Sequence, residues 1–163
     1  MIQTADYRLE NASQDNNKFI LCVDDDPISL ENTLQQVAKL GYSTISATNG
    51  QEAIKLIDSE FKLLKNTFSN SSNSDVDQVK TTRISLILTE YNLPIISGFD
   101  FARAIRTTSP PISNIPIIAL TALPMEEIQN KCIDSGINDY LSKPLKVYEL
   151  EKTLIKWVNE NKQ

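Results

Sequence analysis

The chain has no histidine among its 163 residues, and this absence removes the imidazole group from every candidate reaction. Ser-His-Asp triads and most zinc sites are therefore excluded, and carboxylates, hydroxyls and lysine remain for any chemistry. The chain has only 4 glycines, and none of them forms a glycine-rich phosphate loop, which argues against a nucleotide-binding enzyme. No apolar run is long enough to cross a membrane.

Basic residues are fewer than acidic ones, and cysteines are few. The balance of 16 basic and 21 acidic residues gives a net charge of -5, so we expect no attraction to nucleic acid or to anionic lipid. Proteins or small ligands are the expected partners. Cys22 and Cys132 form no CxxC pair and lie in apolar patterns, which predicts core thiols in a reduced chain. Without a secretory signal, we expect a soluble protein of the cytoplasm or nucleus.

The length suits one domain with a substantial core. Residues 1–17 are polar and are predicted to be a disordered tail, and residues 18–160 are predicted to form the domain. Residues 66–82 are rich in Ser, Asn, Asp and Thr and have little to bury. We therefore expect a disordered insertion there.

Short apolar runs alternate with helical patterns from residue 18 onward. Each run has the hydrophobicity of a strand buried on both faces of a parallel sheet. Five strands, each followed by a helix, are too few for a closed eightfold barrel. The sequence predicts an α/β fold with a doubly wound, five-stranded parallel sheet in three α/β/α layers. The predicted strands are 19–23, 43–47, 84–88, 116–120 and 139–142.

Helix ends and helix faces follow from capping residues and from the 3.6-residue period. Asp26 and Asn49 are predicted N-caps, and Gly41 and Gly136 are predicted to end helices. Two further helices are predicted near residues 98–107 and 146–159. The residues expected to face the core are Leu30, Leu34, Val37, Ala38, Ile54, Ile57, Phe61, Leu64, Phe101, Ile105, Met125, Ile128, Cys132, Val147, Leu150, Leu154, Trp157 and Val158.

Polar groups follow the predicted strands, and the carboxyl ends of parallel strands meet at one edge of a sheet. Carboxylates gathered there would repel one another unless a cation joined them, and hard oxygen ligands suit Mg²⁺. An ammonium and a hydroxyl beside them suit a phosphoryl group. Together these groups predict a phosphoryl-transfer site. They are Asp24, Asp25, Asp26, Thr89, Glu90, Thr121, Ser142, Lys143 and Pro144.

Simpler structural roles exist for several of these residues. Asp26 can be a helix cap, Lys143 a salt-bridge partner and Thr121 a polar strand end. Taken singly, each simple role is the better explanation. Their joint placement at four strand ends in one fold favours a functional site.

Four motifs occur in order, "ILCVDDDP", "LILTEYNLPIISG", "IIALTA" and "DYLSKP". With them the chain resembles the receiver domain of two-component response regulators over residues 18 to about 160. The resemblance implies a flavodoxin-like (βα)5 fold. It also implies a signalling module that is not an enzyme beyond its own phosphorylation and dephosphorylation.

The resemblance implies a metal site. Asp24 and Asp25 match the acidic pair that holds Mg²⁺, or Mn²⁺, in the family. The backbone carbonyl of Asn92 matches a further metal contact. Glu90 stands where the family has the aspartate that is phosphorylated and that also contacts the metal.

The resemblance also implies a switch. Thr121 matches the hydroxyl that follows the phosphoryl group, and Tyr140 matches the aromatic that changes rotamer on activation. Lys143 matches the lysine that contacts the phosphoryl group. Pro144 completes the Lys-Pro peptide, which is often cis in the family.

Glu90 departs from the family pattern because its extra methylene moves the carboxylate toward the metal and the lysine. Nucleophilic attack needs close placement, so we expect little or no phosphorylation at Glu90. In one interpretation Glu90 is native and the chain is a pseudo-receiver, a constitutive interaction module. In the other, Glu90 mimics phosphorylation in a single-domain receiver that otherwise has aspartate. A Mg²⁺-dependent phosphatase-like enzyme and an interaction domain without metal are further alternatives.

The resemblance implies a histidine kinase or a His-phosphotransfer protein as the upstream partner. The downstream partner is expected to be a protein at the face made by the fourth helix, the fifth strand and the fifth helix. A weak homodimer is another expected assembly, and no direct contact with nucleic acid or membrane is expected. The insertion and the polar tail resemble those of eukaryotic receivers, especially fungal ones, in which stress signalling is a plausible setting.

Overall fold

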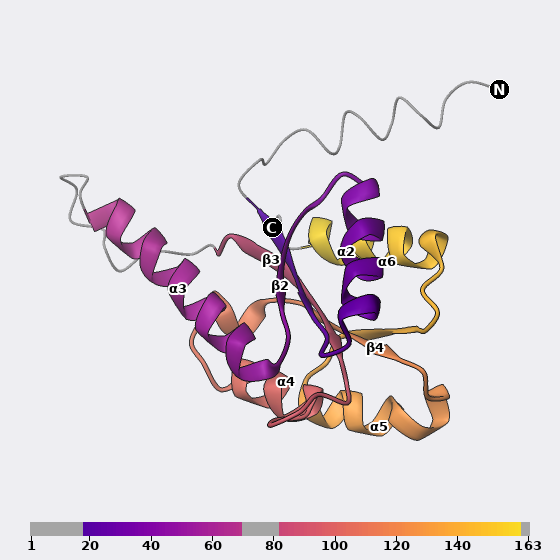
Figure 1. Ribbon diagram of the computed structural model, residues 1–163. Helices are drawn as coiled ribbons and strands as arrows, with labels where there is room; N and C mark the ends of the chain where they lie inside the picture. Colours follow the sequence, from indigo (N-terminus) through magenta and orange to yellow (C-terminus); the bar gives the residue numbers. More distant parts are fainter. Residues whose placement is uncertain (1–17, 70–81, 161–163) are drawn as a thin grey trace.

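The computed structural model describes residues 18–69 and 82–160 and contains one parallel sheet in the order β2-β1-β3-β4-β5 (Figure 1). The predicted doubly wound fold is confirmed. The tail at 1–17 and most of the predicted insertion lie outside the described residues. The strands are β1 (Phe19–Val23), β2 (Ser43–Ala47), β3 (Ile84–Glu90), β4 (Ile117–Thr121) and β5 (Asp139–Ser142).

Helices cover both faces of the sheet (Figure 1). Helices α2 (Pro27–Lys39) and α6 (Val147–Glu160) lie on one face. Helices α3 (Gly50–Ser69), α4 (Gly98–Arg106) and α5 (Met125–Ser135) lie on the other, with a short 3₁₀ helix, η2 (Ile112–Asn114), before β4. No described helix is long and apolar enough to cross a membrane.

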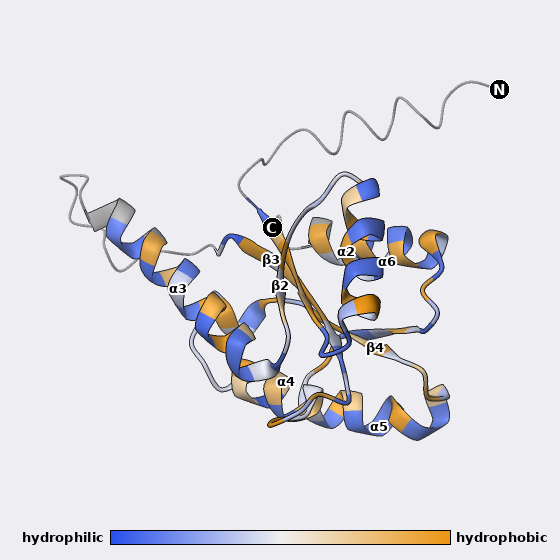
Figure 2. Cartoon of the chain, in the orientation of Figure 1, coloured by the Kyte–Doolittle hydropathy of each residue, from blue (hydrophilic) through white to orange (hydrophobic). Residues whose placement is uncertain are grey.

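Each face of the sheet has its own hydrophobic core because successive strand residues point to opposite faces. In β1, Ile20 and Cys22 pack toward α2 and α6, whereas Leu21 and Val23 pack toward α3, α4 and α5. The apolar strands lie between helices whose outer faces are hydrophilic (Figure 2). Burial of both faces explains why the strands are continuous apolar runs rather than alternating ones.

The predicted capping residues Asp26, Asn49 and Gly136 are confirmed. The Asp26 carboxylate accepts a hydrogen bond of 2.8 Å from the Ser29 backbone N–H, and Pro27 takes the first helical position of α2. Asn49 Oδ1 accepts a hydrogen bond of 2.9 Å from the Glu52 N–H at the start of α3. Gly136 ends α5 with φ at 77°, a left-handed conformation that favours glycine.

Among the predicted core positions whose side chains the structure describes, three are wrong, and Leu64 lies outside that set. Ala38 is exposed, and Thr33 is buried instead because its hydroxyl donates a 3.1 Å hydrogen bond to the Ser29 carbonyl. Val147, the first residue of α6, is 51% exposed. Met125, the first residue of α5, is also exposed.

The ends of α3, β3 and β4 also differ from the sequence prediction. Helix α3 continues to Ser69, so the predicted disordered segment is helical over residues 66–69. The helical spacing of apolar residues continues in the sequence as far as Phe68. The prediction of disorder rested on the polar composition of residues 66–82 and did not take this spacing into account. Strands β3 and β4 end at Glu90 and Thr121, later than predicted, because Glu90 pairs with Leu120 of β4 and Thr121 pairs with Ser142 of β5.

Candidate functional site

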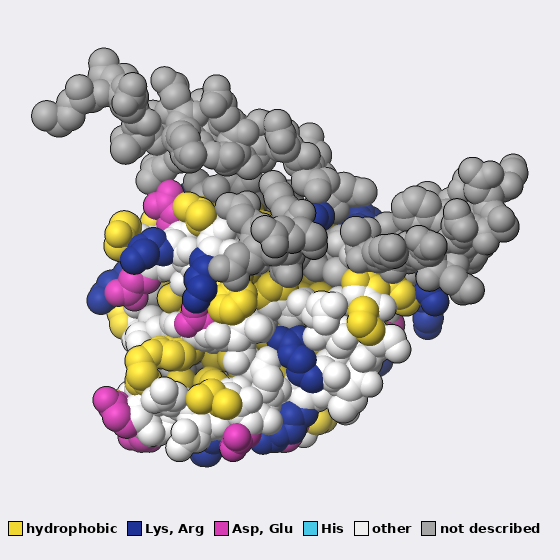
Figure 3. Space-filling model, turned by 180° about the vertical axis from the view of Figure 1, so that it is seen from behind, with side chains coloured by type: hydrophobic (Ala, Val, Ile, Leu, Met, Phe, Trp, Pro, Cys, Tyr) yellow, Lys and Arg dark blue, Asp and Glu magenta, His cyan; other side chains and the backbone are white. Residues whose placement is uncertain are grey.

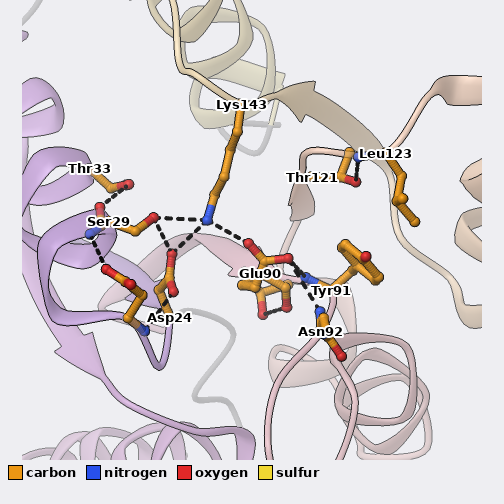
Figure 4. A network of polar contacts seen from close by, with 11 residues as sticks. Asp24, Ser29, Thr33, Glu90, Tyr91, Asn92, Thr121, Leu123 and Lys143 are labelled. Atoms are coloured by element: carbon orange, nitrogen blue, oxygen red, sulfur yellow. Dashed lines mark hydrogen bonds and ion pairs between the residues drawn. The ribbon is translucent and has the colours of Figure 1, made fainter.

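Four chain segments bring polar side chains together at the carboxyl edge of the sheet (Figure 4). Asp24 directly follows β1, Ser29 lies in the first turns of α2, and Glu90 is the last residue of β3. Lys143 directly follows β5 and extends between Asp24 and Glu90. The parallel order places β1 beside β3, so these two carboxylates end on adjacent strands.

Asp24 is the buried acid of the site, with an exposed fraction of 2%. Its Oδ1 accepts a hydrogen bond of 3.0 Å from the Asp26 backbone N–H. Its Oδ2 accepts one of 2.6 Å from the Ser29 hydroxyl and one of 2.8 Å from the Lys143 ammonium. These donors compensate a charge that would be costly to bury alone.

The Glu90 carboxylate is held at both oxygens. Its Oε2 accepts a hydrogen bond of 2.5 Å from the Lys143 ammonium. Its Oε1 accepts bonds from the backbone N–H groups of Tyr91 at 3.1 Å and Asn92 at 3.3 Å. The carboxylate is therefore folded back over its own turn and directed at the lysine.

The Lys143 ammonium is the cation between the two acids, with 21% of its side chain exposed. Burial lowers the pKa of the ammonium, but hydrogen bonds and charge attraction from Asp24 and Glu90 together outweigh it and raise the pKa above its ordinary value. The Lys143 backbone N–H donates to the Thr121 carbonyl at 2.7 Å, and the Lys143-Pro144 peptide is cis. The backbone hydrogen bond to Thr121 therefore fixes the position of the Lys143 Cα, from which the side chain extends into the site.

Ser29 is a site residue that sequence reasoning missed. Its hydroxyl accepts a hydrogen bond of 2.8 Å from the Lys143 ammonium and donates one to Asp24. A serine three residues after the predicted N-cap Asp26 lies in the first turn of the helix, near the strand end. That spacing was the available signal, but a helical serine is usually an ordinary surface residue.

Thr121 and Tyr140 lie apart from this network. Thr121 is buried, and its hydroxyl accepts a hydrogen bond of 2.9 Å from the Leu123 backbone N–H (Figure 4). Tyr140 is partly buried and packs against the core beneath α3, α4 and α5. The two residues lie on adjacent strands, with Tyr140 paired to Ala119.

The acidic side chains of the site lie around the Lys143 ammonium. Within residues 18–69 and 82–160, no group of three or more acidic or thiol side chains is placed to hold a metal ion. Asp24 and Glu90 meet on the Lys143 ammonium, while Asp25 is exposed beside them. The donors have the hard oxygen chemistry that suits Mg²⁺, and the ammonium balances their charge in this arrangement.

Gly98, at the start of α4, allows the helix to approach the site closely. Its N–H donates a hydrogen bond of 2.8 Å to the Tyr91 carbonyl. A Cβ at this position would collide with the Glu90 carbonyl oxygen. Glycine therefore sets the distance between α4 and the turn that follows Glu90.

A family model for the response regulator receiver domain matches residues 65–155. The chain belongs to this family. The receiver is 33% identical over 141 residues to a hybrid signal transduction protein, dokA, of Dictyostelium discoideum. It is 27% identical over 142 residues to the sensor histidine kinase RcsC of Escherichia coli strain K12. These matches cover 86% and 87% of the chain but 7% and 12% of the relatives' lengths.

Solved receiver domains share the fold. The receiver domain of a sensor histidine kinase from Pseudomonas aeruginosa PAO1 is 28% identical with a TM-score of 0.65, covering 88% of this chain and 98% of that one. That structure has a magnesium ion coordinated in its active site cleft. A two-component response regulator from Clostridium difficile shares the fold at 23% identity and a TM-score of 0.65, covering 90% of this chain and 99% of that one.

Proposed function

We propose that this receiver is held in one switch state by Glu90 and signals by protein contact. The observation that carries the proposal is the contact between Glu90 Oε2 and the Lys143 ammonium. In a phosphorylated receiver, the phosphoryl group on the aspartate would contact the lysine ammonium. Here a carboxylate from the same position takes that contact without phosphorylation, so the negative charge is permanent.

The proposed metal is Mg²⁺ or Mn²⁺, with Asp24, Asp25 and the backbone carbonyl of Asn92 as oxygen donors. The family relation and the magnesium ion in the Pseudomonas receiver support this assignment. A bound divalent cation would neutralise charge on phosphoryl oxygens. Glu90 is a further candidate ligand through Oε1, since the Lys143 contact uses Oε2 and Oε1 accepts from backbone N–H groups.

The proposed switch uses Thr121 and Tyr140. The Thr121 hydroxyl now accepts from the Leu123 N–H, so turning toward residue 90 requires that bond to break. Tyr140 would follow the threonine because the two lie on paired strands. Pro144 holds the turn from which Lys143 enters the site.

The proposed output surface is formed by α5, β5 and α6, the fourth helix, fifth strand and fifth helix of the fold. Hydrophobic side chains reach the surface between charges of both signs on the side seen in Figure 3. Such exposed apolar groups suit contact with another protein or a second copy in a weak homodimer. The exposed ones on these helices are Met125, Ile133, Val147, Tyr148 and Ile155.

The proposed upstream partner is a histidine kinase or a His-phosphotransfer protein. The chain itself has no histidine from which to donate a phosphoryl group. The Dictyostelium relative supports a eukaryotic setting, and a fungal stress pathway is one such setting. In a parent form with aspartate at position 90, the chain would accept phosphate. With native glutamate, it would act as a constitutive interaction module.

Acetyl phosphate treatment of the chain and of Glu90→Asp, read by intact mass, tests the proposal. We expect a labile gain of one phosphoryl group in Glu90→Asp and no gain with Glu90 present. Efficient labelling of Glu90 itself would overturn the proposal. The same comparison with a phosphotransfer protein as donor tests the upstream partner.

A Mg²⁺ titration followed by Trp157 fluorescence or NMR separates the receiver from a metal-free interaction domain. The absence of any response at millimolar Mg²⁺ would count against the metal assignment. Release of phosphate from a small phosphoester substrate with turnover would instead support the phosphatase-like alternative.

A further inference from the structure

The Lys143 ammonium has three N–H groups and three acceptors, which come from three different elements. The acceptors are Asp24 Oδ2 at 2.8 Å, Glu90 Oε2 at 2.5 Å and the Ser29 hydroxyl at 2.8 Å. Two of them are carboxylates on neighbouring strand ends, and the third is a neutral hydroxyl on α2. The ammonium is therefore fixed from three directions rather than along a single ion pair.

We propose that Ser29 is a positioning residue that sets where the Lys143 ammonium lies relative to Asp24 and to the acceptor at position 90. The proposal rests on the proposed function, since it concerns the lysine that would meet a phosphoryl group. Ser29 itself touches neither residue 90 nor any reacting atom. Its effect passes through Lys143 and Asp24.

The serine contacts are suited to this role because its hydroxyl acts in both directions at once. It donates to Asp24 Oδ2 at 2.6 Å and accepts from Lys143 at 2.8 Å. The two groups are already paired at 2.8 Å, so the three atoms close a triangle. Hydrogen bonds to charged groups are short and directional, and a closed set of them leaves the ammonium little freedom.

The triangle has a further effect on Asp24. Oδ2 is fully used by the ammonium and the hydroxyl, while Oδ1 accepts the Asp26 N–H and keeps a free lone pair. Ser29 thus determines which carboxylate oxygen remains available. Alanine at position 29 would let the carboxylate turn and the ammonium swing between its two remaining acceptors.

The test uses the Glu90→Asp background, in which phosphorylation is measurable. The contacts of Ser29 do not pass through residue 90, so the same triangle is expected there. Ser29→Ala should slow phosphoryl gain from saturating acetyl phosphate about tenfold, the usual size of a lost supporting contact. Ser29→Thr keeps the hydroxyl and should restore the rate to within about twofold.

Ser97→Ala is the matched control. Ser97 caps α4, where its hydroxyl accepts from the Asp100 N–H at 3.1 Å and donates to the Asp100 carboxylate at 2.9 Å. The Ser97→Ala variant loses a comparable contact at the start of a helix, but Ser97 does not contact Lys143. The rate of phosphoryl gain should therefore stay unchanged in this variant. A rate for Ser29→Ala equal to that of the background variant would overturn the positioning role.

Two more outcomes decide between positioning and packing. Equal slowing in Ser29→Ala and Ser97→Ala, or in Ser29→Ala and Ser29→Thr, would assign the loss to packing and overturn the proposal. If Glu90→Asp alone takes up no phosphoryl group, the proposed function fails first. NMR of the Lys143 ammonium protons in the unaltered chain then still tests Ser29, because slow exchange with water should be lost in Ser29→Ala and kept in Ser29→Thr.

Discussion

Lys143 Nζ lies 2.5 Å from Glu90 Oε2 and 2.8 Å from Asp24 Oδ2, so one ammonium joins the ends of β1 and β3. The Asp24 and Glu90 side chains are 3% and 12% exposed. Two nearly buried carboxylates on adjacent strands would repel each other without this cation. The pairings therefore stabilise the fold as well as shape the site.

Replacing Lys143 by methionine should destabilise the protein by roughly 2–4 kcal/mol, because both acids lose their countercharge. Urea unfolding measures the change. Lys146→Met is the control, since Lys146 is 74% exposed and its pair with Glu149 has a separation of 3.3 Å. That change should cost less than about 1 kcal/mol. Equal losses in the two variants would contradict the interpretation.

The pH dependence of stability follows from the pKa of Lys143, which is raised above the ordinary value of 10.5. A raised lysine pKa stabilises the folded state fully at pH values below the unfolded pKa, and the effect is lost as pH rises through the folded pKa. The stability difference between the unaltered chain and Lys143→Met should stay constant from pH 7 to about 9 and shrink above about 10.5. A difference already falling near pH 8 would show that another group controls it.

Arg106 should be more costly to replace than Arg103. Its Nε donates to the Gly136 carbonyl at 2.9 Å, and one terminal nitrogen donates to the Ser113 and Ile115 carbonyls, each at 2.9 Å. The other donates to Asn138 Oδ1 at 2.7 Å. Burial lowers the pKa of this guanidinium. Arg106→Met should cost roughly 2–3 kcal/mol, because the acceptors lose their donor.

Arg103 in the same helix provides the comparison for Arg106. It forms an exposed ion pair with Asp100, in which the two side chains are 50% and 60% exposed. Arg103→Met should change the unfolding free energy by less than about 1 kcal/mol. Thermal or urea unfolding of both variants gives the answer, and a larger loss at Arg103 would refute the ranking.

Replacing Ile95 by glycine should stabilise the protein. Its φ is 74°, a strained region for a β-branched residue, and its side chain is 70% exposed. Ile95→Gly should relieve about 1–2 kcal/mol of backbone strain in the folded state. Part of this stabilisation is offset because glycine increases the conformational entropy of the unfolded chain. The net gain should be about 0.5–1 kcal/mol. Ile95→Ala keeps the Cβ, so it should show no such gain in the same unfolding experiment.

Much of the fold was predictable because most strands have a recognisable residue composition. β1, β2 and β5 occupy the predicted residues. β1 and β2 are short apolar or β-branched runs, whereas β5 was placed by the "DYLS" segment before Lys143. The ends of β3 and β4 were misplaced because Glu90 and Thr121 look like loop residues in sequence. Their pairing is a property of neighbouring strands and not of the residues themselves.

The site was predictable to the extent that topology dictates it. Asp24, Glu90 and Lys143 come together because parallel strands end at one edge. Ser29 was missed because its role depends on the direction of a helical side chain. The carboxylates were expected to gather around a metal ion, whereas Asp24 and Glu90 both pair with the Lys143 ammonium.

The contact between Asp24 and Lys143 joins residues that are 119 positions apart in the chain. A contact of such long sequence separation closes a large loop, and the entropy of closing that loop opposes it. The ion pair also needs β5 in place, because Lys143 directly follows this strand, which pairs with β4. The ion pair therefore depends on the whole sheet, since a protein in which β5 is not paired with β4 would lose it.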